Sequence, residues 1–148
     1  MPHAAYVVEP QLIFVDRLKQ VLGIAGYEVI GTSSHLDLSG IAAAHAELVF
    51  LDLDFLHDDA LAAVASIHSL LERTAICVYT QRRGNGLGST LIEAGARCAL
   101  SKEATEAEIV GALKAVLVGE TYVDRRVDRL RFGSVPTLTS NERSASDA

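Results

Sequence analysis

A short segment, Leu48–Leu51, carries an apolar side chain at every position. A strand that is apolar on both faces must be covered on both faces, which is typical of a central strand in a parallel sheet between two layers of helices. The segment ends in Asp52 and, two residues later, Asp54. Because burying an unpaired carboxylate is costly, these acids either mark the return of the chain to water or belong to a site that uses their charge.

Apolar segments alternate with amphipathic segments along most of the chain. The predicted strands are Ala4–Val8, Tyr27–Gly31, Glu47–Leu53, Ala75–Thr80 and Cys98–Ser101. The predicted helices begin near Gln11, Ser33, Asp58, Leu91 and Thr105. Ser33 and Ser34 are expected to cap the second helix. Thr105 and Glu108 form a capping-box pattern at the start of the last helix. Five strand–helix units with short connections predict the α/β class: a flavodoxin-like, doubly wound, five-stranded parallel sheet, (βα)5, with helices on both faces.

Size and charge narrow the possible functions. The 148 residues are enough for one domain, and the net charge of −6 argues against a nucleic-acid surface within them. Cys77 and Cys98 lie in apolar stretches, which favours buried thiols in a reduced compartment over a disulfide. The N-terminus does not have the pattern of a signal peptide, and no apolar run approaches the ~18 residues of a membrane span. The expected location is therefore cytoplasmic, with no membrane partner.

Polar residues stand where four of the predicted strands end. Glu9, Asp52, Thr80 and Lys102 follow or close the first, third, fourth and fifth strands, and ligands of such sheets bind at the carboxyl ends of the strands. Carboxylates suit magnesium, while a hydroxyl and an ammonium bind phosphoryl oxygens. Together they would allow a carboxylate to accept a phosphoryl group from a donor. The alternatives are structural: Asp52 caps a turn, Thr80 is a plain hydroxyl, and Lys102 only balances nearby acids.

The sequence resembles a known family over Ala4–Leu130, through "LVFLDL", "VYT" and "EAGARCALSKEATEAEIVGALKAVLVGETYV". It is similar to response-regulator receiver domains, which have the CheY-like architecture, and specifically to those of NarL/FixJ-type transcription regulators. The resemblance implies that Asp52 is the phosphorylated aspartate, Thr80 the phosphoryl-binding hydroxyl residue and Lys102 the site lysine. It implies that Asp54 contacts the metal through its backbone carbonyl.

The chain departs from the family pattern around this site, so the resemblance is to an atypical receiver. The departures are Pro10, Phe55 with Leu56, Gln81, and Ala99 in place of an aromatic residue. Pro10 replaces an acid that would bind the metal, so the magnesium (Mg2+) site implied for Glu9, Asp52 and the Asp54 carbonyl is expected to be weak. Glu9 is either a ligand through water or a solvated acid. Asp54 is interpreted as a loop residue, with the alternative that its side chain swings in to replace the missing acid.

Other motifs favour structural interpretations. The glycine-rich segment "GNGLG", residues 84–88, has neither a Walker ending nor the position of a dinucleotide fingerprint, and is expected to be a mobile loop. The five histidines have no zinc-ligand spacing, and Cys77 has no evident base partner. An enzyme on this fold that uses Asp52 or Cys77 is the remote alternative. We expect no enzymatic activity beyond self-phosphorylation from a donor at Asp52.

Residues 1–120 are predicted to form the receiver domain, 121–132 a helical extension, and 133–148 a disordered linker or the start of a helix-turn-helix domain. The last possibility rests on "PTLTSNER", residues 136–143, which resembles the first residues of LuxR-type output domains. The predicted function is control of a DNA-binding output through phosphorylation at Asp52 and/or dimerisation. The alternative is a phosphorylation-independent dimerisation or ligand-sensing module. The expected partners are a histidine kinase or small phosphodonor, a second copy of the chain, and DNA only through an output domain that these residues do not contain.

Overall fold

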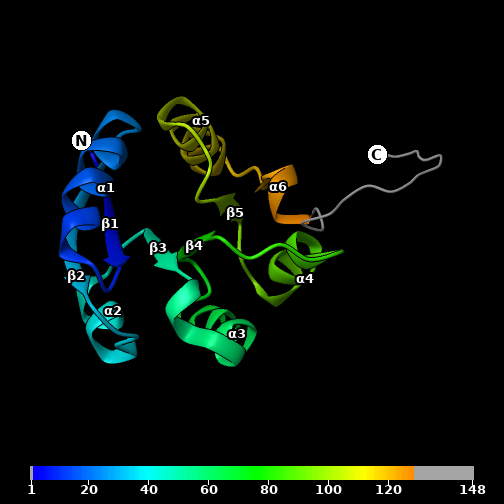
Figure 1. The fold of residues 1–148 in the computed structure, drawn as a ribbon. Helices are drawn as coiled ribbons and strands as arrows, with labels where there is room; N and C mark the ends of the chain where they lie inside the picture. Colours follow the sequence, from blue (N-terminus) through cyan, green and yellow to red (C-terminus); the bar gives the residue numbers. More distant parts are fainter. Residues whose placement is uncertain (1, 129–148) are drawn as a thin grey trace.

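The computed structural model describes residues 2–128, and within them all side chains except those of His57 and Asp58. Strands and helices alternate along the chain (Figure 1). The strands are β1 (His3–Val8), β2 (Tyr27–Ser33), β3 (Leu48–Asp52), β4 (Ala75–Thr80), β5 (Cys98–Ser101) and β6 (Tyr122–Val123). The helices are α1 (Leu12–Ile24), α2 (Leu38–Ala44), the 3-10 helix η1 (Asp54–Asp59), α3 (Ala60–Leu70), α4 (Leu87–Ala94), α5 (Glu106–Leu117) and α6 (Arg125–Asp128).

All strands are parallel, in the order β2-β1-β3-β4-β5-β6. The strand β3 lies between β1 and β4, and all of its residues are buried. The apolar segment Leu48–Leu51 is therefore a central strand, as its sequence predicts, because a strand between two other strands and two helical layers has no face in water.

Helices cover both faces of the sheet (Figure 1). One core cluster packs α1 and α5 onto the sheet, with Leu22 and Leu113 fully buried. The other packs α2, α3 and α4 onto the opposite face, with Ile41, Val64 and Leu91 fully buried. The predicted α/β, doubly wound fold is confirmed. Among residues 2–128, no helix is both long and apolar enough to cross a bilayer.

The sheet has a sixth strand, which corrects the prediction of five. The extension predicted to be helical from residue 121 begins instead with β6, where Tyr122 and Val123 pair with Cys98 and Ala99 of β5. The spacing of Val123 and Val127 fits one face of a helix, and a strand of two residues has no period of its own. The helix is limited to α6. Residues 129–132 of the predicted extension, and the predicted linker or helix-turn-helix start, lie outside the described residues.

The helix starts were predicted with mixed success. The capping box of α5 is confirmed: Glu108 N donates to Thr105 Oγ1 at 3.2 Å, and Thr105 N donates to Glu108 Oε1 at 2.8 Å. The predicted cap of the second helix was wrong, because β2 continues to Ser33 and the cap of α2 is Asp37, which accepts from Gly40 N at 3.0 Å. The buried thiols are confirmed, since Cys77 and Cys98 are free and lie on adjacent strands in the core.

Candidate functional site

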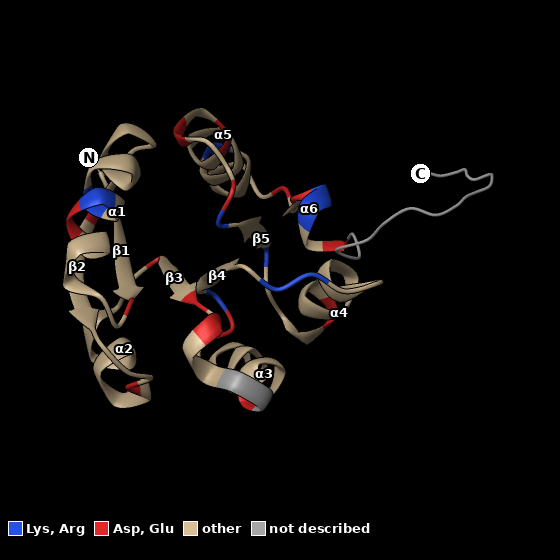
Figure 2. Ribbon diagram, in the orientation of Figure 1, with Lys and Arg blue, Asp and Glu red and all other residues tan. Residues whose placement is uncertain are grey.

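The four polar residues at the strand ends lie at one edge of the sheet. Glu9 follows β1, Asp52 closes β3, Thr80 closes β4 and Lys102 follows β5. Acidic and basic segments meet around the ends of β3 and β4 (Figure 2). A cleft of about 640 Å³ opens here; its lining residues are Pro10, Gln11, Asp52, Asp54, Phe55, Gln81, Arg82, Arg83 and Lys102. The topology therefore brings the predicted residues together, as expected for a doubly wound sheet.

Asp52 is paired with a cation. Its side chain is 6% exposed, and the Nζ atom of Lys102 lies 2.9 Å from Oδ1 and 3.0 Å from Oδ2. The backbone N–H of Asp54 also donates to Oδ1 at 2.9 Å. The buried charge of Asp52 is thus stabilised by an ammonium and a backbone N–H, and its carboxylate faces the cleft.

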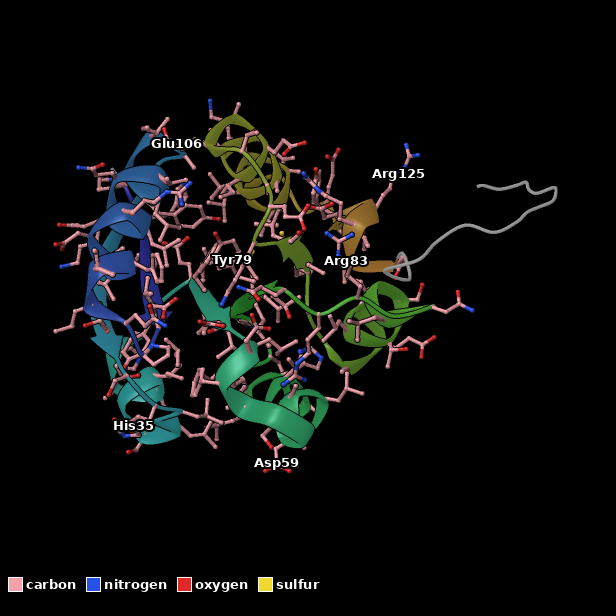
Figure 3. The ribbon with its side chains drawn as sticks, in the orientation of Figure 1. His35, Asp59, Tyr79, Arg83, Glu106 and Arg125 are labelled. Atoms are coloured by element: carbon pink, nitrogen blue, oxygen red, sulfur yellow. The ribbon has the colours of Figure 1, made fainter. Side chains whose placement is uncertain are left out.

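Lys102 is held in place by its backbone and by its neighbours. Its backbone N–H donates to Thr80 O at 2.9 Å, which fixes the start of the loop after β5 next to the end of β4. Its ammonium lies 5.6 Å from the centroid of Tyr79, a ring near the middle of the molecule in Figure 3. Burial opposes the charge of Lys102, but hydrogen bonds to Asp52 and Asp54 outweigh it and raise the pKa of this lysine. The ammonium is therefore the fixed positive charge of the site.

The side chain of Asp54 lies inside the site, which corrects its interpretation as a loop residue. Its Oδ1 accepts from Thr80 Oγ1 at 2.5 Å, and its Oδ2 accepts from Gln81 N at 2.9 Å and from Lys102 Nζ at 2.9 Å. The alternative, that this side chain replaces the missing acid as a metal ligand, stays a prediction. In this structure the carboxylate of Asp54 is bound by hydrogen-bond donors.

Local structure explains the orientation of Asp54. The preceding residue, Leu53, donates its N–H to Tyr79 O at 3.0 Å, so the chain stays next to β4 before it turns into η1. Burial opposes ionisation of Asp54, but the hydrogen bonds from Thr80, Lys102 and Gln81 outweigh it and lower the pKa of the carboxyl group. Asp54 is therefore an anion bound by its neighbours.

Glu9 is buried rather than solvated. It is 2% exposed, and its Oε2 accepts from Gln11 N at 2.9 Å. Burial raises the pKa of Glu9; the hydrogen bond from Gln11 opposes that rise, and the nearby carboxylate of Asp52 adds to it. Glu9 and Asp52 thus form a crowded pair of acids on the side of the site away from Thr80.

The described residues fit a magnesium ion poorly. Among them, no group of three or more Asp, Glu, His or Cys side chains is arranged to hold a metal. Lys102 already neutralises Asp52, and the Asp54 carboxylate is bound to Thr80, Gln81 and the same lysine. Magnesium requires several oxygen ligands and loses its water reluctantly. The magnesium site predicted for Glu9, Asp52 and the Asp54 carbonyl stays a prediction.

The sequence contained no reliable signal for the position of Asp54. Side chains two residues apart share a side only along an extended strand, but β3 ends at Asp52 and Leu53 already has a helical backbone conformation. The role of Gln81 had no signal either, because the backbone N–H is what binds Asp54 and every residue except proline has one.

Comparison with known proteins supports the fold. No family model matches the chain, and no curated protein sequence does so either. Similar solved structures include a LuxR family two-component response regulator from an Aurantimonas species, with a TM-score of 0.74, 20% identity and coverage of 82% of this chain and 89% of that one. The isolated receiver domain of RcsB from Salmonella enterica serovar Typhimurium, studied with the phosphomimetic BeF3−, has a TM-score of 0.75, 15% identity and coverage of 86% and 96%.

A third structure is a LuxR family DNA-binding response regulator from Silicibacter pomeroyi, with a TM-score of 0.69, 19% identity and coverage of 83% of this chain and 98% of that one. The fold of residues 2–128 is therefore that of response-regulator receiver domains. The expected receiver architecture is confirmed at the level of the fold.

Proposed function

We propose that this chain is an atypical receiver module of a two-component-type signalling protein, with Asp52 as its phosphoacceptor. The observation that carries the proposal is the ion pair of Lys102 with Asp52, at 2.9 Å, at the edge of a receiver fold where Thr80 also ends its strand. A nucleophilic carboxylate, a fixed ammonium and a hydroxyl at one edge of the sheet are the groups that phosphoryl transfer to an aspartate needs.

The proposed reaction is a simple displacement. A carboxylate oxygen of Asp52 attacks the phosphorus of a histidine kinase phosphohistidine or of a small phosphodonor. The P–O bond to Asp52 forms while the bond from phosphorus to the donor's leaving group breaks, and the leaving group keeps that electron pair. Lys102 offsets the negative charge of the transferred group, and the Thr80 hydroxyl donates to one of its oxygens once its hydrogen bond to Asp54 is released. The chain supplies mainly position and charge.

The proposed output is a shift between two packings of the α4 and α5 surfaces, which changes self-association and thereby a DNA-binding segment. The short helix α6 supports this route. Its Asp128 accepts from the backbone N–H of Gly88 in α4, and its Val127 carbonyl accepts from Gly84 N in the loop after β4 at 3.1 Å. A rearrangement of that loop would therefore change the contacts of α6, where the described part of the chain ends.

A second candidate is a module that works without phosphorylation. It is favoured by one observation: Asp54 already binds the hydroxyl, the backbone N–H and the ammonium that a phosphoryl group would use. The remote enzyme alternative gains no support. Cys77 is fully buried, and burial raises the pKa of its thiol well above the ordinary value, so it is a poor nucleophile.

The proposal is tested by intact mass spectrometry after incubation with magnesium and a small phosphodonor. We expect one labile phosphoryl adduct on the wild type, none on Asp52→Asn, and an adduct on Asp16→Asn, which removes an exposed acid on α1. Wild-type and Asp54→Ala proteins that both remain free of adduct at every magnesium concentration would leave the phosphorylation-independent module as the better account.

A further inference from the structure

Donors from separate parts of the chain converge on the Asp54 carboxylate. The Thr80 hydroxyl comes from the end of β4, the Gln81 N–H from the residue after it, and the Lys102 ammonium from the loop after β5. A hydroxyl, a backbone N–H and an ammonium form a set that binds any small oxyanion, whether a carboxylate or a phosphoryl group. In this structure the oxyanion that they bind is part of the chain.

Two of these donors are fully used by Asp54. A hydroxyl and a backbone N–H each have a single hydrogen to donate, and both Thr80 and Gln81 direct theirs to this carboxylate. Only Lys102 divides its donors between Asp52 and Asp54. A phosphoryl group on Asp52 could therefore not be bound by Thr80 or Gln81 until Asp54 moved away.

The contact also orders the β4–α4 loop, which contacts α6. The Thr80 oxygen that donates to Asp54 accepts from Arg82 N at 2.9 Å. The next residue, Arg83, forms an ion pair with Glu103 after β5, and Gly84 N donates to Val127 O. A continuous set of contacts thus runs from Asp54 through the β4–α4 loop to α6.

We propose that Asp54 is a built-in ligand of the oxyanion-binding donors of this site. Its carboxylate takes the place of an external oxyanion and holds Thr80, Gln81 and the β4–α4 loop in the bound arrangement without one. The receiver is thereby kept in an oxyanion-bound state by its own sequence, and a phosphoryl group on Asp52 must displace Asp54. The binding of these donors by Asp54 is independent of phosphorylation. The competition between Asp54 and a phosphoryl group rests on the proposed function of Asp52.

The occupation of the oxyanion-binding donors by Asp54 is tested by replacing Asp54 with a residue that leaves these donors free. In Asp54→Ala, we expect formate and inorganic phosphate to raise the melting temperature in a saturable way, relative to chloride at equal ionic strength. The wild type should show no saturable rise, and Asp54→Ala combined with Thr80→Val should bind both anions at least about threefold more weakly, because one neutral donor is lost. Asp54→Asn, which keeps the shape of the side chain, controls for folding.

The same anions give the result that would overturn the inference. If formate and phosphate produce no saturable shift in Asp54→Ala, or the same shift in the wild type, Asp54 does not occupy an oxyanion site. If Asp54→Ala does not fold, Asp54→Asn takes its place in the test. This variant removes the charge of the side chain but keeps its shape, so the donors stay partly occupied. We therefore expect it to bind the anions, but weakly.

The competition is tested by the rate of adduct formation from a small phosphodonor. We expect Asp54→Ala to form the Asp52 adduct about tenfold faster than the wild type, a change equivalent to about 1.4 kcal/mol in the barrier. The matched control is Asp59→Ala at the other end of η1, an exposed acid that Figure 3 shows away from Tyr79.

The outcomes separate the two proposals. Equal rates in Asp54→Ala and the wild type would contradict the competition. Anion binding by Asp54→Ala with no adduct in any variant would support Asp54 as the internal ligand and contradict phosphorylation at Asp52.

Discussion

The ammonium of Lys102 lies 2.9 Å from Oδ1 of Asp52, and both groups are largely shielded from water, with side-chain exposures of 21% and 6%. The same ammonium lies 2.9 Å from Oδ2 of Asp54. Lys102 therefore contacts two carboxylates at the edge of the sheet, with the buried Glu9 next to them and Arg82 Nε 4.0 Å from Oδ1 of Asp54. The stability of this edge should depend on Lys102 even if no phosphoryl group ever binds there.

Replacing Lys102 should reveal that dependence. Lys102→Met leaves Asp52 without its cation and Asp54 with only Arg82. We expect the free energy of unfolding to fall by about 2–3 kcal/mol, because removing one partner of a shielded pair leaves the other charge uncompensated. Urea unfolding measures the loss. Lys19→Met, an exposed position on α1, is the control and should change stability by less than about 0.5 kcal/mol. Similar losses in the two variants would rule out a special role for the Lys102 pair.

Glu9 should make the free energy of unfolding fall as the pH rises, whereas most ion-paired carboxyl groups make it rise. Its raised pKa means that the folded state keeps the proton at pH values where the unfolded chain has released it. The folded state is then favoured at low pH, and stability falls as pH rises from the ordinary pKa of glutamate through the raised value. Asp52 and Lys102 are the charged groups that act on it.

Glu9→Gln should therefore stabilise the protein at neutral pH. The amide keeps an oxygen for the hydrogen bond from Gln11 and removes the repulsion with Asp52. We expect a melting temperature higher by roughly 2–5 °C at pH 7, with the difference shrinking as the pH falls below the ordinary pKa of glutamate. The control is Glu28→Gln, an exposed acid on β2. A lower melting temperature in Glu9→Gln at pH 7 would show that the charge of Glu9 is favourable.

The extension after α5 should contribute to the stability of the domain. Asp124 is 4% exposed and accepts from Ser101 N at 3.1 Å and from Arg126 Nε at 2.9 Å. Arg126→Met removes the charged partner, and we expect a loss of about 2 kcal/mol in the free energy of unfolding. Arg125→Met, next to it but exposed, should stay within about 0.5 kcal/mol. If urea unfolding finds no difference between them, the extension is not an integral part of the fold.

Two helical glycines should respond oppositely to alanine. A Cβ atom at Gly88 would lie 2.5 Å from Val123 Cγ1 and 2.8 Å from Asp128 Oδ1, whereas one at Gly111 would meet nothing within 4 Å. Gly88→Ala should therefore destabilise the protein by about 1–3 kcal/mol through overpacking. Gly111→Ala in α5 should stabilise it by about 0.5–1 kcal/mol through helix propensity. Thermal unfolding distinguishes the two, and a neutral Gly88→Ala would mean that α4 and the extension are less closely packed.

The strands that the sequence predicts well are those bounded by polar residues. The bounds of β4 and β5 match the predicted Ala75–Thr80 and Cys98–Ser101, because each apolar run stops at a turn or a charge. The strand β6 was missed because two residues carry no period, and its pairing depends on β5, far away in sequence.

The candidate site, like the sheet, could be predicted only in part from the sequence. Asp52, Thr80 and Lys102 could be predicted to share an edge, because parallel strands place their carboxyl ends together. The side-chain position of Asp54 depends on three donors from outside its own segment, and local pattern does not encode their convergence. Tertiary contacts thus decide which of the two acids is bound by which groups.

The central claim, that Asp54 is bound by the oxyanion donors, is tested most directly by the NMR chemical shift of the Gln81 amide proton. A backbone N–H that donates to a carboxylate resonates downfield. We predict a downfield Gln81 amide in the wild type, an upfield change in Asp54→Ala, a smaller one in Asp54→Asn, and a return downfield when formate is added to Asp54→Ala. The amide of Arg97, which donates to Ile76 O at the opposite end of β4, should not move. A Gln81 amide that is unchanged by Asp54→Ala would contradict the account.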